Sequence, residues 1–340
     1  MIDRFNTAEQ SLIYERYGHT NMKILVTPTS FGPSSKLAPK EKLLNYADEI
    51  VYNPHKRPLT EDELIPLLDG CDGYLAGLDF ITERVIESAE NLRVISRYGT
   101  GCDRVDLQAA GKHGILVTNT PGANADAVAD LTLGLMLAVA RTIPALDRAA
   151  KSGEWPRHTG IELGGKTLGI LGFGMIGKKV AQRAAGFNMT VTAYDPYMDE
   201  VYAKKTGVVS GELEQVIAGS DFISLHLPLT DATKNIINND SIEKMRPGTI
   251  VINTSRGGLI DEEALFQALE RKHLGGAALD AFEKEPPDAG KPLYQLPNVV
   301  ITPHTGAHTA EAAFNMAAMA VDNLISVLET GQCPHIVKNS

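Results

Sequence analysis

Cysteine is scarce in this 340-residue sequence, which contains only Cys71, Cys102 and Cys333, all widely spaced. These positions fit neither a disulfide framework nor the spacing of a zinc site, so the sequence predicts no bound metal. Few and scattered cysteines are typical of a reducing compartment, and we therefore expect a cytoplasmic protein.

A dense run of lysine or arginine is missing as well. The chain has 32 Lys and Arg against 42 Asp and Glu, which gives a formal net charge of −10. Nucleic acids and anionic membranes are both bound through clustered positive charge, so we expect neither as a partner.

Long hydrophobic runs are also absent. Residues 1–21 carry charges throughout and lack the apolar segment of a signal peptide, so we expect an extension with no chemistry of its own. The most apolar long stretch, "ADLTLGLMLAVAR" (129–141), is too short to cross a bilayer and is better explained as a buried helix.

What the sequence does contain is two series of short apolar runs with helical patterns between them. The first series is "KILVTP" (23–28), "GYLAGL" (73–78), "RVISRY" (93–98) and "ILVTNT" (115–120). The second is "TLGILG" (167–172), "TVTAYD" (190–195), "FISLHL" (222–227), "TIVINT" (249–254), "GGAALD" (275–280) and "NVVITP" (298–303). Strands buried on both faces that alternate with helices form parallel sheets, so the sequence predicts an α/β protein of two doubly wound domains. A helix over 126–143 would join them, and a helical run over 310–331 follows the second series.

A glycine motif, Gly172-x-Gly174-x-x-Gly177, follows one of these strands and opens a helix. In a dinucleotide-binding turn the first glycine permits the tight turn, the second lets the backbone approach a pyrophosphate, and the third allows close helix packing. The next strand ends in Asp195, where an acidic residue can hold the adenosine ribose and repel a 2′-phosphate. Together these features favour NAD over NADP as the cofactor.

Several further motifs surround this fingerprint: "RYGTGCDRVDLQAA", "HLPLTDAT", "NTSRGGLIDEEAL", "AALDAFEKEPP" and "TPHTGA". Through them the chain resembles the D-isomer-specific 2-hydroxyacid dehydrogenases from Met22 to about Val337. It is similar to the phosphoglycerate dehydrogenases of this family, in a short form without their terminal regulatory domain.

The resemblance implies a division of the chain into two domains. Residues 1–121 and 307–340 would form the substrate domain, and residues 122–306 the NAD-binding Rossmann domain, separated by an active-site cleft. It also implies a homodimer through the NAD-binding domains, with the helix over 126–143 and the arm around Trp155 as the contact.

Three residues at strand ends suit the chemistry of a 2-hydroxy or 2-keto acid. Arg256 can hold a carboxylate with its two-pronged guanidinium and polarise the adjacent carbonyl. His304 can exchange the hydroxyl proton as a general acid/base, and Glu285 can bond its other ring nitrogen. The resemblance assigns these three positions to the catalytic Arg, Glu and His. Glu283 competes with Glu285, and only the family pattern of Glu directly before Pro favours the latter.

The resemblance also implies cofactor contacts along the same strand ends. They comprise Met175 and Ile176 with the three glycines at the pyrophosphate, Leu227 and Pro228 beside the adenosine, and Thr254, Asp280 and Gly306 nearer the nicotinamide, where Arg256 and His304 also lie. His226 could line the cofactor or be structural.

The segment Arg97-Tyr98-Gly99-Thr100 would contact the substrate, with the backbone of Gly99 and Thr100 meeting its carboxylate. In phosphoglycerate dehydrogenases arginines of this domain bind the phosphate; Arg97 occupies one such place, but Gly77 stands about where another is expected. We therefore expect a D-2-hydroxy acid substrate, with phosphoglycerate, hydroxypyruvate or glyoxylate all compatible. His308, where relatives commonly have a small residue, could reshape the pocket or face solvent.

Two alternatives remain. Formate dehydrogenases share the fold but pair the active-site histidine with glutamine, so Glu285 counts against that activity. An NAD-sensing, corepressor-like binding protein would keep the same residues, and only turnover of a 2-keto acid separates it from the enzyme.

Overall fold

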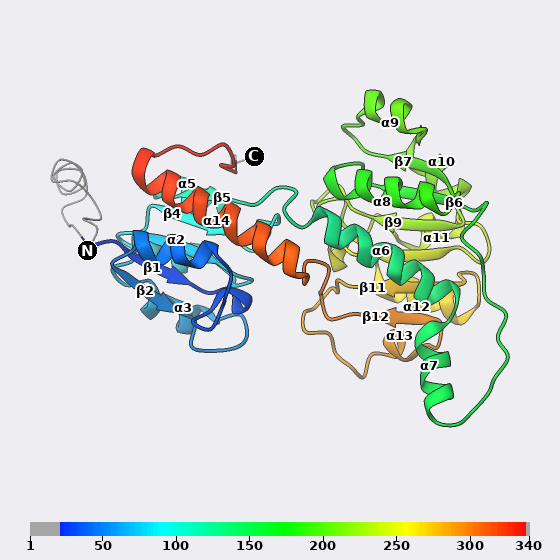
Figure 1. Cartoon of the computed structure of the whole chain (residues 1–340). Coiled ribbons are helices and arrows are strands. Elements are labelled where there is room, and N and C mark those ends of the chain that lie inside the picture. Colours follow the sequence, from blue (N-terminus) through cyan, green and yellow to red (C-terminus); the bar gives the residue numbers. More distant parts are fainter. Residues whose placement is uncertain (1–20, 338–340) are drawn as a thin grey trace. The chain divides into compact units, whose positions relative to one another are not determined.

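The computed structural model describes residues 21–337, so the expected N-terminal extension lies almost wholly outside the described residues. The chain divides into two compact units (Figure 1). The first contains the described residues 21–124 and 309–337, and the second is Ala125–His308. The boundaries expected from the sequence, 121/122 and 306/307, differ from these by a few residues.

The first unit contains a five-stranded parallel sheet in the order β2-β1-β3-β4-β5. Its strands are β1 (Lys23–Val26), β2 (Glu49–Tyr52), β3 (Gly73–Ala76), β4 (Val94–Arg97) and β5 (Leu116–Thr118). Its helices are η1 (Thr29–Phe31), α2 (Pro39–Tyr46), α3 (Glu61–Leu68), α4 (Glu83–Glu87), α5 (Leu107–Lys112) and α14 (Ala310–Thr330). The C-terminal helix α14 packs on this sheet, and Ser96 Oγ donates to Ala320 O at 2.8 Å.

The second unit contains a seven-stranded parallel sheet in the order β12-β11-β10-β9-β6-β7-β8. Its strands are β6 (Thr167–Leu171), β7 (Thr190–Tyr194), β8 (Val209–Ser210), β9 (Phe222–Leu225), β10 (Ile250–Asn253), β11 (Gly276–Leu279) and β12 (Val299–Ile301). Its helices are α6 (Ala125–Ala140), α7 (Ile143–Lys151), α8 (Met175–Gly186), α9 (Glu200–Thr206), α10 (Leu213–Gly219), α11 (Asn239–Glu243), η2 (Gly257–Leu259), α12 (Glu262–Glu270) and α13 (Pro292–Gln295). The chain winds outward in both directions from β6 and β9, and ligands of such sheets bind beside this switch point.

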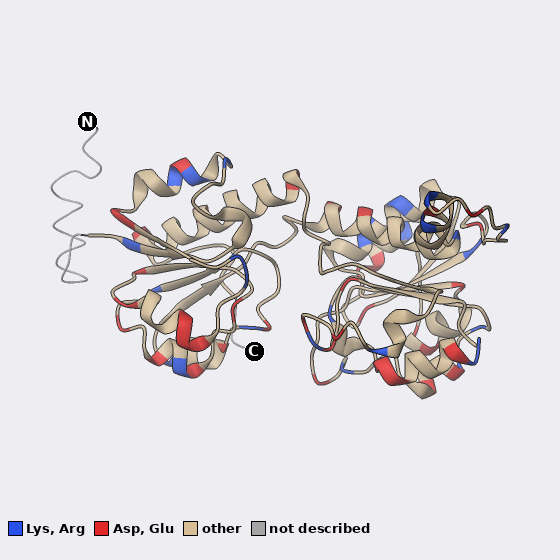
Figure 2. Ribbon diagram, turned by 90° about the horizontal axis from the view of Figure 1, so that it is seen from below, with Lys and Arg blue, Asp and Glu red and all other residues tan. Residues whose placement is uncertain are grey.

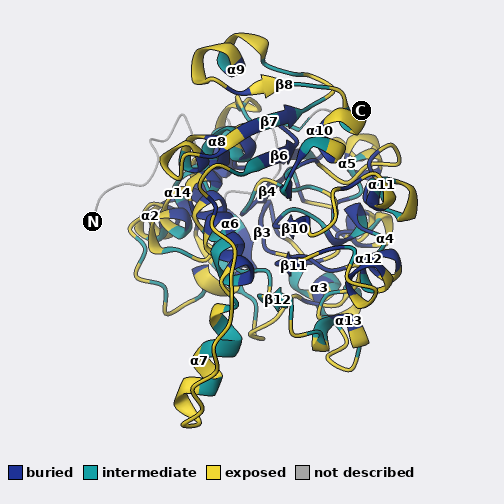
Figure 3. Ribbon diagram, turned by 90° about the vertical axis from the view of Figure 1, so that its right-hand side faces the viewer, coloured by how far each residue is buried: buried dark blue, intermediate teal, exposed yellow. Residues whose placement is uncertain are grey.

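The two doubly wound parallel sheets confirm the fold class predicted from the sequence. Each predicted apolar run contains a strand, and the central strands of both sheets are buried, as the dark-blue strands labelled in Figure 3 show. The sequence missed β2 and β8, which lie at sheet edges. The helix expected over 126–143 is confirmed as α6, which ends at Ala140, three residues earlier than expected; Thr142, with a left-handed φ of 53°, then separates it from α7.

Charged side chains lie mainly outside the strands, and blue and red segments are interspersed on the helices and loops (Figure 2). In residues 21–337 no single helix is long and apolar enough to cross a membrane; α6 and α7 together pass that test by length and composition, but they are bent by 63°.

Candidate active site

The glycine turn lies between β6 and helix α8, next to the switch point of the sheet. Gly172 has a φ of +102°, and a Cβ there would lie 2.5 Å from the carbonyl carbon of His226. A Cβ on Gly177 would lie 2.1 Å from Gly172 O, so both positions require glycine. Gly174, by contrast, is exposed to open space at the N-terminus of α8, which has no side-chain cap. An uncapped helix N-terminus with room for an approaching group fits a dinucleotide pyrophosphate.

Asp195 lies directly after β7, and its carboxylate is held at the edge of this turn. Oδ2 accepts the backbone N–H of Phe173 at 2.7 Å, and Oδ1 accepts that of Tyr197 at 2.8 Å. Each carboxylate oxygen can accept a second hydrogen bond, so the fixed carboxylate retains capacity for ribose hydroxyls.

The other predicted cofactor residues follow neighbouring strands of this sheet. Met175 and Ile176 open α8, with Met175 59% exposed. Leu227 is buried and Pro228 exposed after β9. Thr254 is buried after β10, where its hydroxyl lies 3.0 Å from that of Thr132 on α6.

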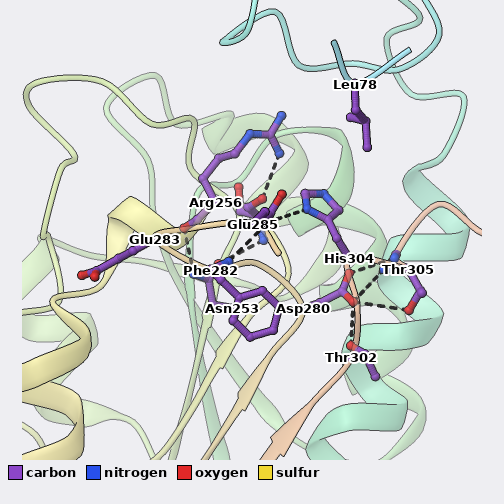
Figure 4. A network of polar contacts seen from close by, with 12 residues as sticks. Leu78, Asn253, Arg256, Asp280, Phe282, Glu283, Glu285, Thr302, His304 and Thr305 are labelled. Carbon is purple, nitrogen blue, oxygen red and sulfur yellow. Dashed lines mark hydrogen bonds and ion pairs between the residues drawn. The ribbon is translucent and has the colours of Figure 1, made fainter. Parts of the chain in front are cut away.

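A His–Glu pair forms where β11 and β12 end. His304 Nδ1 lies 2.7 Å from Glu285 Oε1, and Figure 4 shows the imidazole and the carboxylate pointing toward one another. The same oxygen accepts the backbone N–H of Phe282 at 3.3 Å. The two side chains keep 32% and 19% of their surface exposed, so the pair is partly shielded but reachable by a small molecule.

Glu283, which the sequence offered as the other candidate partner of His304, points away from the imidazole (Figure 4). Its Oε1 accepts the backbone N–H of Glu262 at 3.3 Å, and its Oε2 lies 3.6 Å from Lys291 Nζ. The structure therefore pairs His304 with Glu285 and gives Glu283 a place against the N-terminus of α12.

The loop that carries His304 is held by Asp280, which is buried to 1% exposure. Asp280 Oδ1 accepts the Thr302 hydroxyl at 2.6 Å and the Thr305 N–H at 2.8 Å, and Oδ2 accepts the Gly306 N–H at 2.8 Å. His304 itself adopts a left-handed φ of 52°, which is unfavourable for a residue other than glycine. Asp280, predicted as a nicotinamide contact, thus holds the chain on both sides of His304, and Gly306, predicted for the same role, is one of the donors that it binds.

Arg256 leaves the carboxyl end of β10 in an extended conformation, and Nη1 donates to Ser255 O at 2.8 Å. Figure 4 shows its side chain on the same side of the loops as Glu285 and His304. The next residue allows no side chain, because a Cβ on Gly257 would lie 1.8 Å from the carbonyl carbon of Phe282. The segment with Arg256 therefore packs directly against the loop with Glu285.

The predicted substrate segment lies in the first unit, after β4. Arg97 is 4% exposed and donates from Nη1 to Ala76 O at 2.8 Å and from Nε to Gly101 O at 3.1 Å. The Tyr98 hydroxyl donates to Ala313 O on α14 at 2.8 Å, so this side chain is part of the core. Gly99 has a φ of +147° with open space around it, and Thr100 Oγ1 donates to Thr120 O at 3.2 Å.

The sequence missed the residues that support the site, namely Asn253, Glu262, Thr302 and Thr305. All four lie inside motifs quoted above, but their bonding partners could not be predicted from the sequence. His308 is exposed at the end of the second unit. In residues 21–337 no group of three or more His, Cys, Asp or Glu side chains could hold a metal ion.

The switch point, the glycine turn and the acidic residue directly after β7 define the second unit as a dinucleotide-binding α/β domain. Comparison with known proteins narrows this class. Residues 133–306 match the family model described as D-isomer specific 2-hydroxyacid dehydrogenase, NAD binding domain. The chain belongs to this D-isomer specific 2-hydroxyacid dehydrogenase family, and the cofactor that its second unit binds is NAD.

Individual relatives agree with this assignment. A hydroxypyruvate reductase of Thermotoga maritima is 43% identical over 291 residues, which cover 84% of this chain and 93% of the relative. A D-3-phosphoglycerate dehydrogenase of Methanocaldococcus jannaschii is 43% identical over 283 residues, 82% of this chain, but the chain spans only about half of that relative (54%). The NAD⁺-bound 3-phosphoglycerate dehydrogenase structure from Entamoeba histolytica has a TM-score of 0.79 at 29% identity, covering 94% of this chain and 99% of that one.

Proposed function

We propose that the chain is an NAD-dependent D-2-hydroxyacid dehydrogenase in which Arg256, Glu285 and His304 carry out the reaction. The observation that supports this most directly is the 2.7 Å contact between His304 Nδ1 and Glu285 Oε1. When bound, the nicotinamide supplies the hydride that is added to C2 of a 2-keto acid. The residues of this chain have to deliver the proton and orient the acid.

His304 is the proton donor to the C2 oxygen in the direction of reduction, and the acceptor in the direction of oxidation. Because Nδ1 is engaged by Glu285, Nε2 is the ring nitrogen left to exchange the proton. The Glu285 carboxylate compensates the positive charge that the ring carries when it is protonated. Arg256 holds the substrate carboxylate and polarises the C2 carbonyl.

For the substrate we propose an unphosphorylated 2-keto acid such as hydroxypyruvate or glyoxylate ahead of a phosphorylated one. Arg97 is buried and two of its N–H groups are bonded to the backbone carbonyls of Ala76 and Gly101, so it serves the fold. Position 77 has little room for a cation, since a Cβ on Gly77 would lie 3.1 Å from Pro28 Cα. This edge of the first unit therefore offers a weak site for a phosphate.

A substrate panel tests the function. NADH oxidation should be measured with hydroxypyruvate, glyoxylate and 3-phosphohydroxypyruvate, and repeated with NADPH. We expect turnover with NADH and the highest kcat/KM for one of the two unphosphorylated acids. Preference for the phosphorylated acid would overturn the substrate proposal. No turnover across the panel, with NADH still bound, would favour the NAD-sensing, corepressor-like alternative.

The His–Glu pair has a matched control within the same loop. Glu285→Gln should lower kcat by about 100-fold, the usual size of a general acid/base contribution being 10²–10⁴. Glu283→Gln removes the same charge two residues away but leaves the His304 contact intact, so its kcat should stay within about twofold of the parent enzyme. Equal losses in the two variants would contradict the role of Glu285.

We also propose that the enzyme is a homodimer through the second unit. Helix α6 is largely buried in its own unit, but α7 has no buried residue (Figure 3). In the segment after α7, Trp155 is 88% exposed. Ile143 and Ile161 add exposed apolar surface, 50% and 39% respectively, which is typical of a protein contact. Light scattering should give twice the 36.6 kDa of one chain, and Trp155→Asp should shift the mass toward that of the monomer.

A further inference from the structure

A buried amide lies at the last residue of β10, three residues before Arg256. Asn253 is 0% exposed, and its position in the sheet is fixed because its backbone carbonyl accepts the Asp280 N–H at 2.9 Å. A buried amide side chain costs stability unless both its donor and its acceptor are bonded. An apolar residue would pack equally well in this strand. The presence of an amide is therefore explained by the hydrogen bonds that it makes outside the strand.

Both ends of the amide are bonded to the segment that carries Arg256. Asn253 Oδ1 accepts the Ser255 N–H at 3.0 Å, and Asn253 Nδ2 donates to Arg256 O at 2.8 Å. The two bonds close a tight turn directly after the strand, and Arg256 leaves this turn with φ −138° and ψ 139°. The Asn253 side chain thus connects the end of β10 to the Ser255 N–H and the Arg256 carbonyl, which lie on either side of the Ser255–Arg256 peptide bond.

The surroundings leave this turn little freedom to relax. Ser255 Oγ donates to Leu227 O at 2.7 Å on the neighbouring strand end. On the other side, Gly257 lies so close to the Phe282 carbonyl that even a methyl group would clash. The Phe282 N–H in turn donates to Glu285 Oε1, so the turn sets the distance between Arg256 and the His–Glu pair.

We infer that Asn253 is a positioning residue for Arg256, an inference that rests on the proposed role of Arg256 in holding the substrate carboxylate. The turn needs a donor and an acceptor from one short side chain. Aspartate keeps the acceptor for Ser255, but it has no N–H for Arg256 O and places a negative charge against that carbonyl. Serine keeps an acceptor but is too short to reach the carbonyl.

The test is Asn253→Asp, assayed with the best keto acid of the panel. We expect KM for the keto acid to rise by about 10- to 100-fold, because a displacement of about 1 Å at a reacting group costs up to 10²-fold. The dissociation constant of NADH, measured by its fluorescence, should change by less than about twofold. Asn253→Ser should behave in the same way, and it serves the test if the aspartate variant does not fold.

A double-mutant cycle separates positioning from a general structural lesion. In an Arg256→Gln background, Asn253→Asp should cause no further loss of kcat/KM, because no guanidinium remains to be positioned. The same loss in both backgrounds, or an unchanged KM in the single variant, would overturn the inference.

Asn238→Asp is the matched control. Its amide makes a similar pair of bonds, from Ser241 N–H at 3.1 Å and to Asn235 O at 2.9 Å, at the start of α11. It contacts neither Arg256 nor Asn253, so KM should not change. If the parent enzyme turns over no keto acid, the proposed function fails. If the parent is active and KM is insensitive to Asn253, only the positioning role fails.

Discussion

The imidazole of His226, which is partly buried and has a fully buried Nδ1, makes the stability of the second unit depend on pH. His226 follows β9 beside the glycine turn, and its Nε2 lies 2.8 Å from Ser224 Oγ. Its Nδ1 is buried and has no hydrogen-bond partner in residues 21–337. Burial lowers the pKa of His226 to about 3, from an ordinary value of 6.5. The ring is therefore neutral in the folded protein throughout the physiological range.

The sign of the effect follows from proton uptake. Between pH 6.5 and pH 3 the unfolded chain binds a proton at this position and the folded chain does not, so stability falls as the pH falls. The loss is about 1.4 kcal/mol per pH unit, or about 2 kcal/mol between pH 7 and pH 5. Ion pairs lower the pKa values of Asp126, Asp199 and Glu214, so these carboxylates lose their contribution to stability only as the pH falls below the ordinary carboxylate range of about 4, outside the interval from pH 7 to pH 5.

Urea unfolding at pH 5, 6 and 7 measures this effect as the difference between the parent and His226→Gln. The parent should lose about 2 kcal/mol more than the variant over this interval, whatever the absolute stability of the variant. His158→Gln, which changes an exposed histidine of the same unit, should keep the pH dependence of the parent. If the parent and His226→Gln lose stability in parallel, the ring is protonated in the folded state or accessible to water, and the reasoning is refuted.

Two further substitutions test the cofactor turn and the packing beside the site. Asp195→Ala removes the fixed carboxylate after β7 and should reduce the preference for NADH over NADPH by about tenfold, measured as the ratio of kcat/KM values; an unchanged ratio would show that another group reads the ribose. Gly257→Ala places a methyl group against the Phe282 carbonyl and should lower Tm by several degrees, since overpacking costs about 1–3 kcal/mol and 1 kcal/mol corresponds to about 2–4 °C for a unit of this size. Gly219→Ala, at the end of α10 with nothing within 4 Å, is the control and should leave Tm unchanged or higher.

The fold was predictable because most of its strands are buried on both faces and therefore appear as apolar runs. The strands that escaped prediction lack this signal. β2 has the sequence EIVY with an exposed Glu49, and β8 has only two residues, one of them exposed. Such edge strands are defined by their neighbours in the sheet, which the local sequence does not reveal.

The residues of the candidate site likewise fall into those that the sequence predicted and those that it did not. Arg256 and His304 stand in recognisable motifs at strand ends, where the chemistry of single side chains suggests a role. Asn253 and Asp280 act through bonds to backbone groups, and Asp280 reaches Gly306, 26 residues further along the chain. Because such contacts depend on how separate loops meet, no local pattern predicts them.

Which of Glu283 and Glu285 pairs with His304 is determined by tertiary contacts and does not follow from side-chain chemistry. The two carboxylates are identical and stand two residues apart. Glu262 on α12 is buried to 2% exposure, accepts the Glu283 N–H at 3.0 Å, and has its charge compensated by Lys291 Nζ at 2.5 Å. The Glu262 N–H donates to the Glu283 carboxylate in return, so residue 283 is tied to α12 through both its backbone and its side chain. Glu285, two residues further along the chain, makes none of these contacts with α12, and its carboxylate is the one that pairs with His304.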